Sequence, residues 1–140
     1  MQLCFDAHQG QTDKSGLPYV FHPMHVAEQM QDEITTIVAL LHDVVEDTTY
    51  TLEDLRERGF PEEVVEVVYL LTKQKGLPEQ EYYERIKKNP VAKTVKLADL
   101  RHNSDFTRLN IINDDALAKY GSYKEKTRFL EEGENKSLGE

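Results

Sequence analysis

The sequence predicts an all-α fold. Apolar residues fall at helical spacing along the chain, and no segment alternates between apolar and polar residues for long enough to predict a strand. Proline, glycine and capping residues divide this pattern into helices of ordinary length. The 140 residues suit one domain with a sizeable core, and no repeat or linker divides residues 1–140.

Three helices are expected in the N-terminal third of the chain. The first covers about residues 2–9. A loop follows that contains turn-forming residues: Gly10, Gly16 and Pro18. Pro23 suits the first turn of the second helix, because proline has no N–H to leave unpaired there. That helix ends near Asp32, and the third covers about residues 34–46.

Capping and breaking residues delimit the later helices. Thr51 is typical of an N-cap, and Gly59 ends the helix that Thr51 begins. Pro61 opens a helix rich in valine and leucine that continues through Thr72. The remaining expected elements are a break at 76–78, a charged helix over about 79–88, a helix beginning at Pro90, a last helix over about 114–132 and a polar tail from about 133, expected to be frayed.

Composition excludes several classes of function. The chain has 17 basic and 26 acidic residues and a net charge of −9, which argues against general binding to nucleic acid or an anionic membrane. No apolar run approaches the roughly 20 residues of a membrane span, and the N-terminal residues are no secretion signal. The single cysteine, Cys4, suits a reducing compartment, so we expect a cytoplasmic protein.

The expected helix over residues 34–46 has two different faces. At about 100° per residue, four polar side chains fall within an arc of roughly 140°. They are His42, Asp43, Glu46 and Asp47, and the opposite side carries Ile34, Ile37, Val38, Leu41, Val44 and Val45. Three carboxylates on one partly buried face are costly unless protons or a cation neutralise them. A divalent metal is the simplest explanation.

Two further residues complete a candidate metal site. His22 precedes Pro23 at the start of the second helix, and Asp99 lies on a helix whose other side is apolar. With His42 and Asp43 they form a set of two nitrogen and two oxygen ligands, which suits manganese, iron or zinc better than calcium. Simpler interpretations exist for each: His22 as a helix cap, His42 as a core histidine, and Asp99 paired with a neighbouring cation. His25 is a competing ligand, and His8 and His102 are interpreted as structural.

These motifs resemble those of the HD-domain metal-dependent phosphohydrolases. The ordered set comprises His22-Pro23, His42-Asp43, Glu46-Asp47 and Lys96-Leu97-Ala98-Asp99. Within that superfamily it is most similar to the hydrolase domain of RelA/SpoT alarmone enzymes and to the small alarmone hydrolases. The resemblance implies a helical fold that holds one Mn²⁺ through His22, His42, Asp43 and Asp99. It also implies that Glu46 and Asp47 handle the attacking water and its proton.

The reaction that the resemblance implies is removal of pyrophosphate from the 3′ position of guanosine tetra- or pentaphosphate. Bifunctional relatives carry a synthetase domain after this one, and the chain here ends at Glu140, so we expect a protein that only degrades. The sequence departs from the family where Asp13 replaces an arginine that contacts the guanine base. Asp105 replaces a second cation. A carboxylate at either position repels phosphate oxygens, which bears on the identity of the substrate.

Hydrolysis of a phosphate ester or diphosphate needs positive charge to offset the phosphates of the substrate. The candidate substrate-binding residues are Lys14, Lys96, Arg101 and Arg108, with Asn103 as a hydrogen-bonding partner for a base or ribose. Tyr19 is a candidate for stacking on the base or for packing in the core. Two alternatives stay open: an HD hydrolase of another nucleotide or phosphoester, and a non-catalytic module that binds a nucleotide. We expect a small-molecule nucleotide as the partner in each case.

Overall fold

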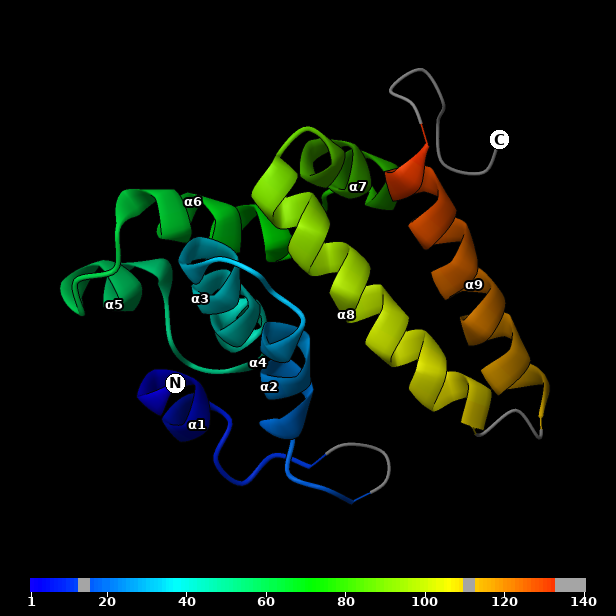
Figure 1. Ribbon diagram of the computed structural model, residues 1–140, viewed down its shortest axis with the longest axis horizontal. Coiled ribbons are helices and arrows are strands. Elements are labelled where there is room, and N and C mark those ends of the chain that lie inside the picture. The colour runs from blue at the N-terminus through cyan, green and yellow to red at the C-terminus, as the bar shows by residue number, and fades with distance from the viewer. Residues whose placement is uncertain (13–15, 110–112, 133–140) are drawn as a thin grey trace.

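In a computed structural model, the chain folds into α-helices, and one isolated antiparallel bridge joins Thr12 to Pro18 (Figure 1). The structure describes residues 1–12, 16–109 and 113–132. The helices in this part of the chain are α1 (Gln2–Ala7), α2 (Phe21–Glu28), α3 (Glu33–Leu41), α4 (Val44–Asp47), α5 (Leu52–Glu57), α6 (Glu62–Leu71), α7 (Glu79–Lys87), α8 (Pro90–Leu109) and α9 (Asp114–Glu131). The all-α prediction is confirmed.

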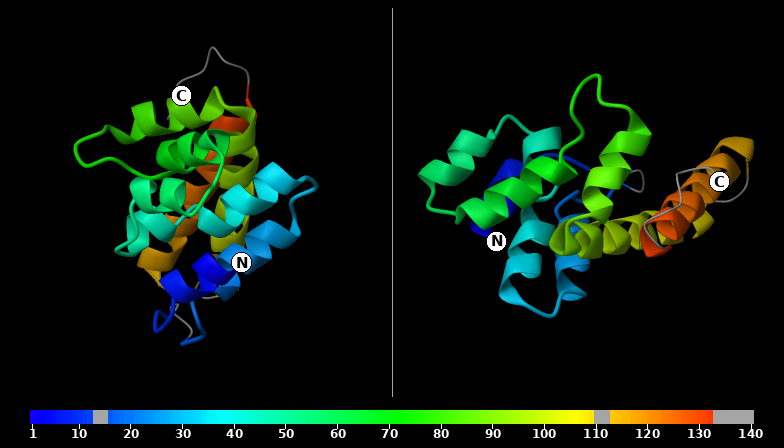
Figure 2. Two further views of the ribbon diagram at one scale, coloured as in Figure 1. Left: turned by 90° about the vertical axis from the view of Figure 1, so that its left-hand side faces the viewer. Right: turned by 90° about the horizontal axis from the view of Figure 1, so that it is seen from above.

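Helix α8 is the element around which the others pack. It contacts α2, α3, α6, α7 and α9, and α9 lies along its outer side (Figures 1 and 2). Helix α3 in turn contacts α2 and α6 as well as α8. Because α2, α3 and α8 each contact the other two, side chains from these three helices can converge on one point.

The buried side chains of α3 and α4 follow the helical spacing predicted from the sequence. Val38, Leu41 and Val44 are buried, whereas Ile37 and Val45 are half-buried and pack against the same core. The same hydrophobic core includes buried side chains of α6, α7 and α8. Burial of a side chain of this size contributes about 1.5–3 kcal/mol, so this face holds α3 against its neighbours.

One predicted element is wrong in detail. A single helix was expected over about residues 34–46, but α3 ends at Leu41 and α4 begins at Val44. The Nδ1 atom of His42 lies 2.5 Å from the carbonyl oxygen of Ala39. In an unbroken helix, that oxygen would accept from the N–H of Asp43. The imidazole of His42 thus takes the place of the Asp43 N–H at the Ala39 carbonyl. The side chains of His42 and Asp43 therefore lie at a break between two helices.

The predicted helix ends agree with the structure at several positions. The Thr51 side chain accepts from the N–H of Asp54, whose carboxylate accepts from the N–H of Thr51, which forms a capping box. Gly59 follows α5 with a φ of +90°, a conformation that favours glycine. Pro61 is the N-cap of α6. Asp32, expected at the end of α2, instead caps α3 by accepting from Thr35.

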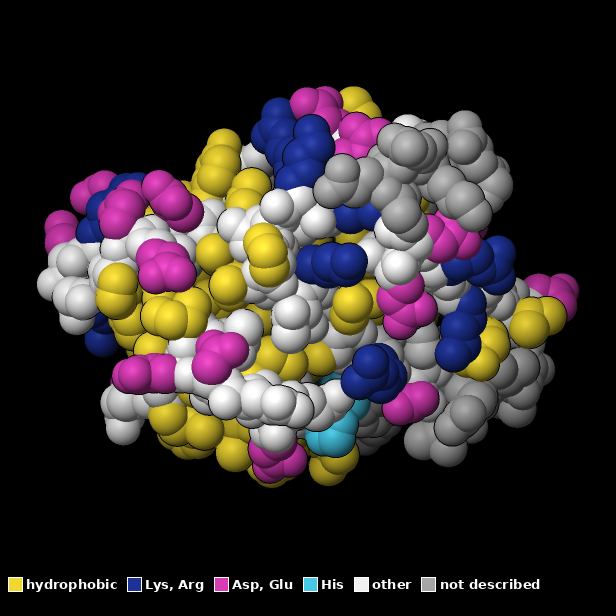
Figure 3. Space-filling model, turned by 45° about the horizontal axis from the view of Figure 1, so that its top comes forward, with side chains coloured by type: hydrophobic (Ala, Val, Ile, Leu, Met, Phe, Trp, Pro, Cys, Tyr) yellow, Lys and Arg dark blue, Asp and Glu magenta, His cyan; other side chains and the backbone are white. Residues whose placement is uncertain are grey.

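The surface carries charges of both signs. On the face shown in Figure 3, acidic and basic side chains are interspersed rather than gathered into one basic surface, as far as the described residues show. None of the helices in the described ranges is long and apolar enough to cross a membrane. The polar tail predicted from about residue 133 lies outside the described residues.

Candidate metal centre

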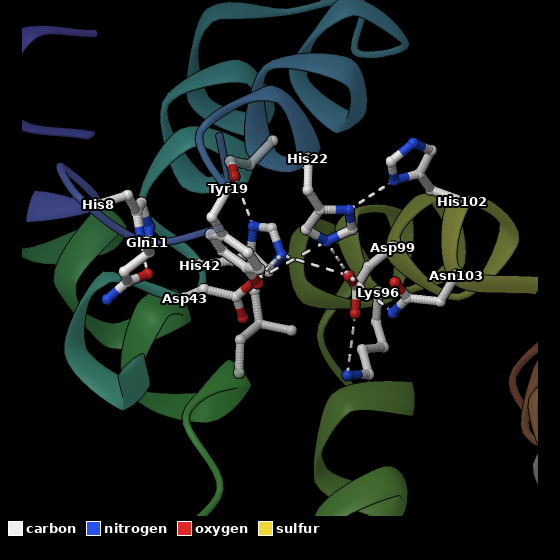
Figure 4. Close-up of polar contacts among 12 residues, drawn as sticks. His8, Gln11, Tyr19, His22, His42, Asp43, Lys96, Asp99, His102 and Asn103 are labelled. Carbon is white, nitrogen blue, oxygen red and sulfur yellow. Dashed lines mark hydrogen bonds and ion pairs between the residues drawn. The ribbon is translucent and has the colours of Figure 1, made fainter. Parts of the chain in front are cut away.

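Four side chains from three parts of the chain converge where α2, α3 and α8 meet (Figure 4). His22 comes from α2, and Asp99 comes from α8. His42 and Asp43 come from the break between α3 and α4. One nitrogen or oxygen atom of each lies within 4.8 Å of the others. The structure therefore brings together the residues that the sequence predicts as ligands.

The facing atoms of this group are two imidazole nitrogens and two carboxylate oxygens. His22 Nε2 lies 2.7 Å from Asp99 Oδ1 and 3.8 Å from Asp43 Oδ2. His42 Nε2 lies 3.0 Å from Asp43 Oδ2 and 3.4 Å from Asp99 Oδ1. An ion with ligand distances near 2.1 Å sets neighbouring donors about 3.0 Å apart and opposite donors about 4.2 Å apart. The three shorter separations are close to that of neighbouring donors around one cation, and the separation of 3.8 Å lies between the neighbouring and the opposite value.

His42 provides a separate indication that the group suits a metal. Its side chain is buried, and its Nε2 has no hydrogen-bond partner among the described residues. Because Nδ1 faces the carbonyl oxygen of Ala39, Nδ1 carries a proton, and Nε2 is the nitrogen that faces the two carboxylates. Both carboxylates would stabilise a proton or a metal ion on Nε2.

The charges of the group also favour a cation. Burial opposes ionisation of Asp99, but Lys96, His22 and His42 outweigh burial and hold the pKa of Asp99 well below its ordinary value. Burial likewise opposes protonation of His42, but Asp43 and Asp99 raise its pKa well above the ordinary value. His42 also lowers the pKa of Asp43 against the effect of burial, so both aspartates stay ionised inside the protein. The field that attracts a proton there also attracts a metal ion.

Glu46 and Asp47 lie beside the group, on the exposed side of α4. Desolvation by the surrounding protein raises the pKa of Glu46, and the charges of Asp43 and Asp47 add to this. The pKa of Asp47 is raised mainly by desolvation and then by Asp43. Gln11 Nε2 donates to the backbone oxygen of Asp47 at 2.9 Å.

The predicted substrate-binding residues have different surroundings. Lys96 Nζ lies 3.1 Å from Asp99 Oδ2, and its ammonium also faces the rings of Tyr82 and Tyr83. Asn103 Nδ2 lies 3.4 Å from Asp99 Oδ1. Lys96 and Asn103 therefore stand one helical turn before and after the aspartate, on the same face of α8.

The structure does not bring the other predicted cations to this group. Arg101 is exposed and donates to the side chain of Gln29, the C-cap of α2. Lys14 lies outside the described residues, as does the side chain of Arg108. Contact with a substrate stays a prediction for these residues, as it does for Lys96 and Asn103.

Several contacts that hold the candidate ligands in place were not predicted from the sequence. Tyr19 was interpreted as a base-stacking or core residue, but its hydroxyl donates to Asp43 Oδ2 at 2.6 Å. His8 is buried against the Tyr19 ring, and its Nδ1 lies 2.9 Å from Gln11 Oε1. His102 Nδ1 contacts His22. The position of His102 one turn after Asp99 was the available signal, because residues at this spacing share a helix face.

Comparisons with known proteins agree with this geometry. The family model described as "HD domain" matches residues 1–103, which include all four candidate ligands. A guanosine-3′,5′-bis(diphosphate) 3′-pyrophosphohydrolase from Haemophilus influenzae is 41% identical over 112 residues, which cover 70% of this chain and 16% of that protein. The bifunctional (p)ppGpp synthase/hydrolase SpoT of Escherichia coli is 39% identical over 113 residues, with the same coverage. The chain thus spans about a sixth of the length of these curated relatives.

A solved structure is similar over nearly the whole chain. It is described as a metazoan ortholog of SpoT that hydrolyzes ppGpp and plays a role in starvation responses. The two chains superpose with a TM-score of 0.78 and 30% sequence identity, over 98% of this chain and 85% of the other. The fold, the family model and the convergence of two histidines and two aspartates lead to one conclusion: the chain belongs to the HD domain family.

Proposed function

We propose that this protein is a metal-dependent phosphohydrolase that removes pyrophosphate from the 3′ position of guanosine 3′,5′-bis(diphosphate). The observation that carries the proposal is the convergence of His22, His42, Asp43 and Asp99 beside the exposed carboxylates of Glu46 and Asp47. The names of the relatives support this substrate class, since those proteins are named for acting on this nucleotide. We further propose that residues 1–140 act as one domain and work in the cytoplasm.

The proposed metal is Mn²⁺, held by the two histidines and two aspartates of the group. A set of two nitrogens and two oxygens suits manganese, iron and zinc. The chemistry supplied by a bound divalent ion is polarisation of a phosphoryl group and activation of a water molecule. Tyr19 holds one ligand in place, because its hydroxyl donates to Asp43 Oδ2. Lys96 does the same for Asp99 and offsets its charge.

Glu46 and Asp47 are proposed to accept and relay the proton of the attacking water. A general base works best when its pKa lies close to the working pH, and desolvation raises the pKa of both carboxyls toward that range. The contact between Gln11 and the Asp47 carbonyl ties the end of α4 to the segment before α2.

Positive charge for the phosphates is proposed to come from Lys96, Lys14, Arg101 and Arg108, with Asn103 available to a base or ribose. Lys96 is the best supported of these, because its ammonium is within contact distance of a candidate metal ligand. The ammonium of Lys96 already balances the charge of Asp99, so its attraction would be divided between Asp99 and the phosphates of the substrate.

The test of the proposed function is the identity of the product. Purified protein with Mn²⁺ should release pyrophosphate and guanosine 5′-diphosphate from guanosine 3′,5′-bis(diphosphate), and chelation should stop the reaction. A panel of other nucleotides and phosphomonoesters serves as the comparison. Release of orthophosphate instead would identify a phosphomonoesterase. Tight nucleotide binding with no product over hours would identify a binding module and overturn the proposal.

Metal binding should raise the thermal stability of the protein. An ion that binds only the folded state at 100 times its dissociation constant adds about 2.7 kcal/mol. For a chain of this size the melting temperature should therefore rise by about 6–10 °C. Differential scanning fluorimetry with Mn²⁺ against a chelator would measure it. The Asp99→Asn variant should show no rise, and an equal rise in that variant would place the binding elsewhere.

A further inference from the structure

The second nitrogen of His22 has an unusual partner. While Nε2 faces the carboxylate of Asp99, Nδ1 points away from the four-residue group and lies 2.5 Å from Nδ1 of His102 (Figure 4). At this distance one proton must lie between the two nitrogens, because two lone pairs or two N–H groups would repel each other. One histidine therefore donates and the other accepts.

Metal coordination decides which of them donates. An imidazole binds a metal through a lone pair, so a neutral His22 that binds through Nε2 carries its proton on Nδ1. His102 must then accept through its own Nδ1. The geometry agrees with this role, because Nδ1 is the atom of His102 that faces Nδ1 of His22, at 2.5 Å.

The surrounding helices hold His102 in the accepting position. His102 lies one turn after Asp99 on α8, so a single helix contacts both edges of the His22 ring. The His102 ring stacks on His22 with a centroid distance of 4.8 Å and on His25 with a distance of 4.3 Å. Both of these partners belong to α2, so the contact also joins α2 to α8.

The same arrangement serves the other histidine of the group. His42 Nδ1 faces the carbonyl oxygen of Ala39, which is a neutral acceptor. Metal-binding histidines commonly donate their second N–H to a neighbouring acceptor, which sets the tautomer and orientation of the ring. A neutral imidazole does this for His22 without adding a third negative charge beside Asp43 and Asp99.

We propose that His102 is a positioning residue for the metal site: it accepts the Nδ1–H of His22 and thereby directs the Nε2 lone pair of His22 toward the ion. This inference rests on the proposed metal site. Its immediate consequence is on metal affinity, which can be measured without substrate.

Two complementary substitutions separate the hydrogen bond from ring stacking. His102→Phe keeps an aromatic ring but has no acceptor, whereas His102→Asn places an amide oxygen near the former Nδ1 and removes the ring. We expect the phenylalanine variant to bind Mn²⁺ about 10–100-fold more weakly than wild type in calorimetric titrations. The Mn²⁺ affinity of the asparagine variant should stay within about fivefold of the wild-type affinity. The same is expected of His25→Leu, which removes only a stacking neighbour.

The outcomes distinguish this inference from the proposed function. If wild type binds no Mn²⁺, the metal site and this inference are both wrong. If wild type binds and His102→Phe binds equally well, only this inference is wrong. Weak binding by His102→Asn together with normal binding by His102→Phe would assign the effect to packing and overturn the proposal. Circular dichroism of the metal-free variants checks that each is folded.

A spectroscopic measurement on the unmodified protein provides a second test. Proton–nitrogen spectra of the histidine rings in the Zn²⁺-loaded protein should show His22 protonated at Nδ1 and His102 unprotonated at Nδ1. Zinc is the probe because it is diamagnetic and accepts the same ligand types. The reverse assignment of the two protons would contradict the proposal whether or not the variants fold.

Discussion

Replacing Asp43 with asparagine should remove both the proposed metal binding and the proposed hydrolytic activity. Asp43 Oδ2 faces His42 Nε2 at 3.0 Å and accepts from the Tyr19 hydroxyl at 2.6 Å, so it lies at the centre of the polar group. Asparagine has nearly the same shape but lacks the negative charge. Loss of about 4 kcal/mol of metal-dependent stabilisation in the transition state corresponds to a rate reduction on the order of 10³.

The measurement combines metal analysis of the purified variant with initial rates at saturating Mn²⁺. Asp115→Asn is the matched control, because it makes the same change at an exposed position in the first turn of α9. The control should bind metal and react at the wild-type rate. An Asp43→Asn variant that kept both its metal and its turnover would show that the ion, if any, binds elsewhere.

The second large effect is expected from Glu46→Gln. This change removes the proposed proton acceptor but leaves all four candidate metal ligands in place. General-base catalysis contributes about 10²–10⁴-fold, so kcat should fall by that factor while Mn²⁺ affinity changes little. Glu57→Gln, on the exposed last turn of α5, is the control for loss of one negative charge. Loss of metal from Glu46→Gln would instead identify Glu46 as a ligand.

The pH dependence of kcat should report the same residue. The base form of Glu46 is the ionised form, and desolvation with the charges of Asp43 and Asp47 raises its pKa above the ordinary value of 4.5. Activity should therefore be present above this raised pKa and fall as the pH drops through it. In wild type, the midpoint of the fall in kcat at low pH should therefore lie above pH 4.5. In Glu46→Gln this midpoint should change. An unchanged midpoint would exclude Glu46 as the titrating group.

The helical architecture was predictable because its determinants are local in the sequence. Thr51 and Asp54 form a capping box from residues three positions apart, and Pro61 begins α6 without help from distant residues. The apolar spacing over α3 and α4 likewise predicted which side chains, such as Val38 and Val44, face the core. The break at residues 42–43 was not predictable this way, because a ring nitrogen takes over the backbone acceptor at Ala39.

The candidate ligands were predictable for a different reason. His42 and Asp43 are adjacent, and their residue types indicate metal chemistry wherever the chain places them. The choice of His22 over His25 as the third ligand depended on a family resemblance, since both lie on the same helix one turn apart. The structure separates them: His22 Nε2 faces Asp99, whereas His25 stacks on His102.

Short-range information was sufficient for the class of fold, for most helix ends and for the chemical character of the site. Those features depend on residues within a turn or two of one another, so they can be recognised before the chain folds. The packing of α2, α3 and α8 decided which side chains contact the candidate ligands. Examples are the hydrogen bond from the Tyr19 hydroxyl to Asp43 and the contact of His102 with His22. These pairs are 24 and 80 residues apart, and no local pattern encodes which of many distant side chains will meet.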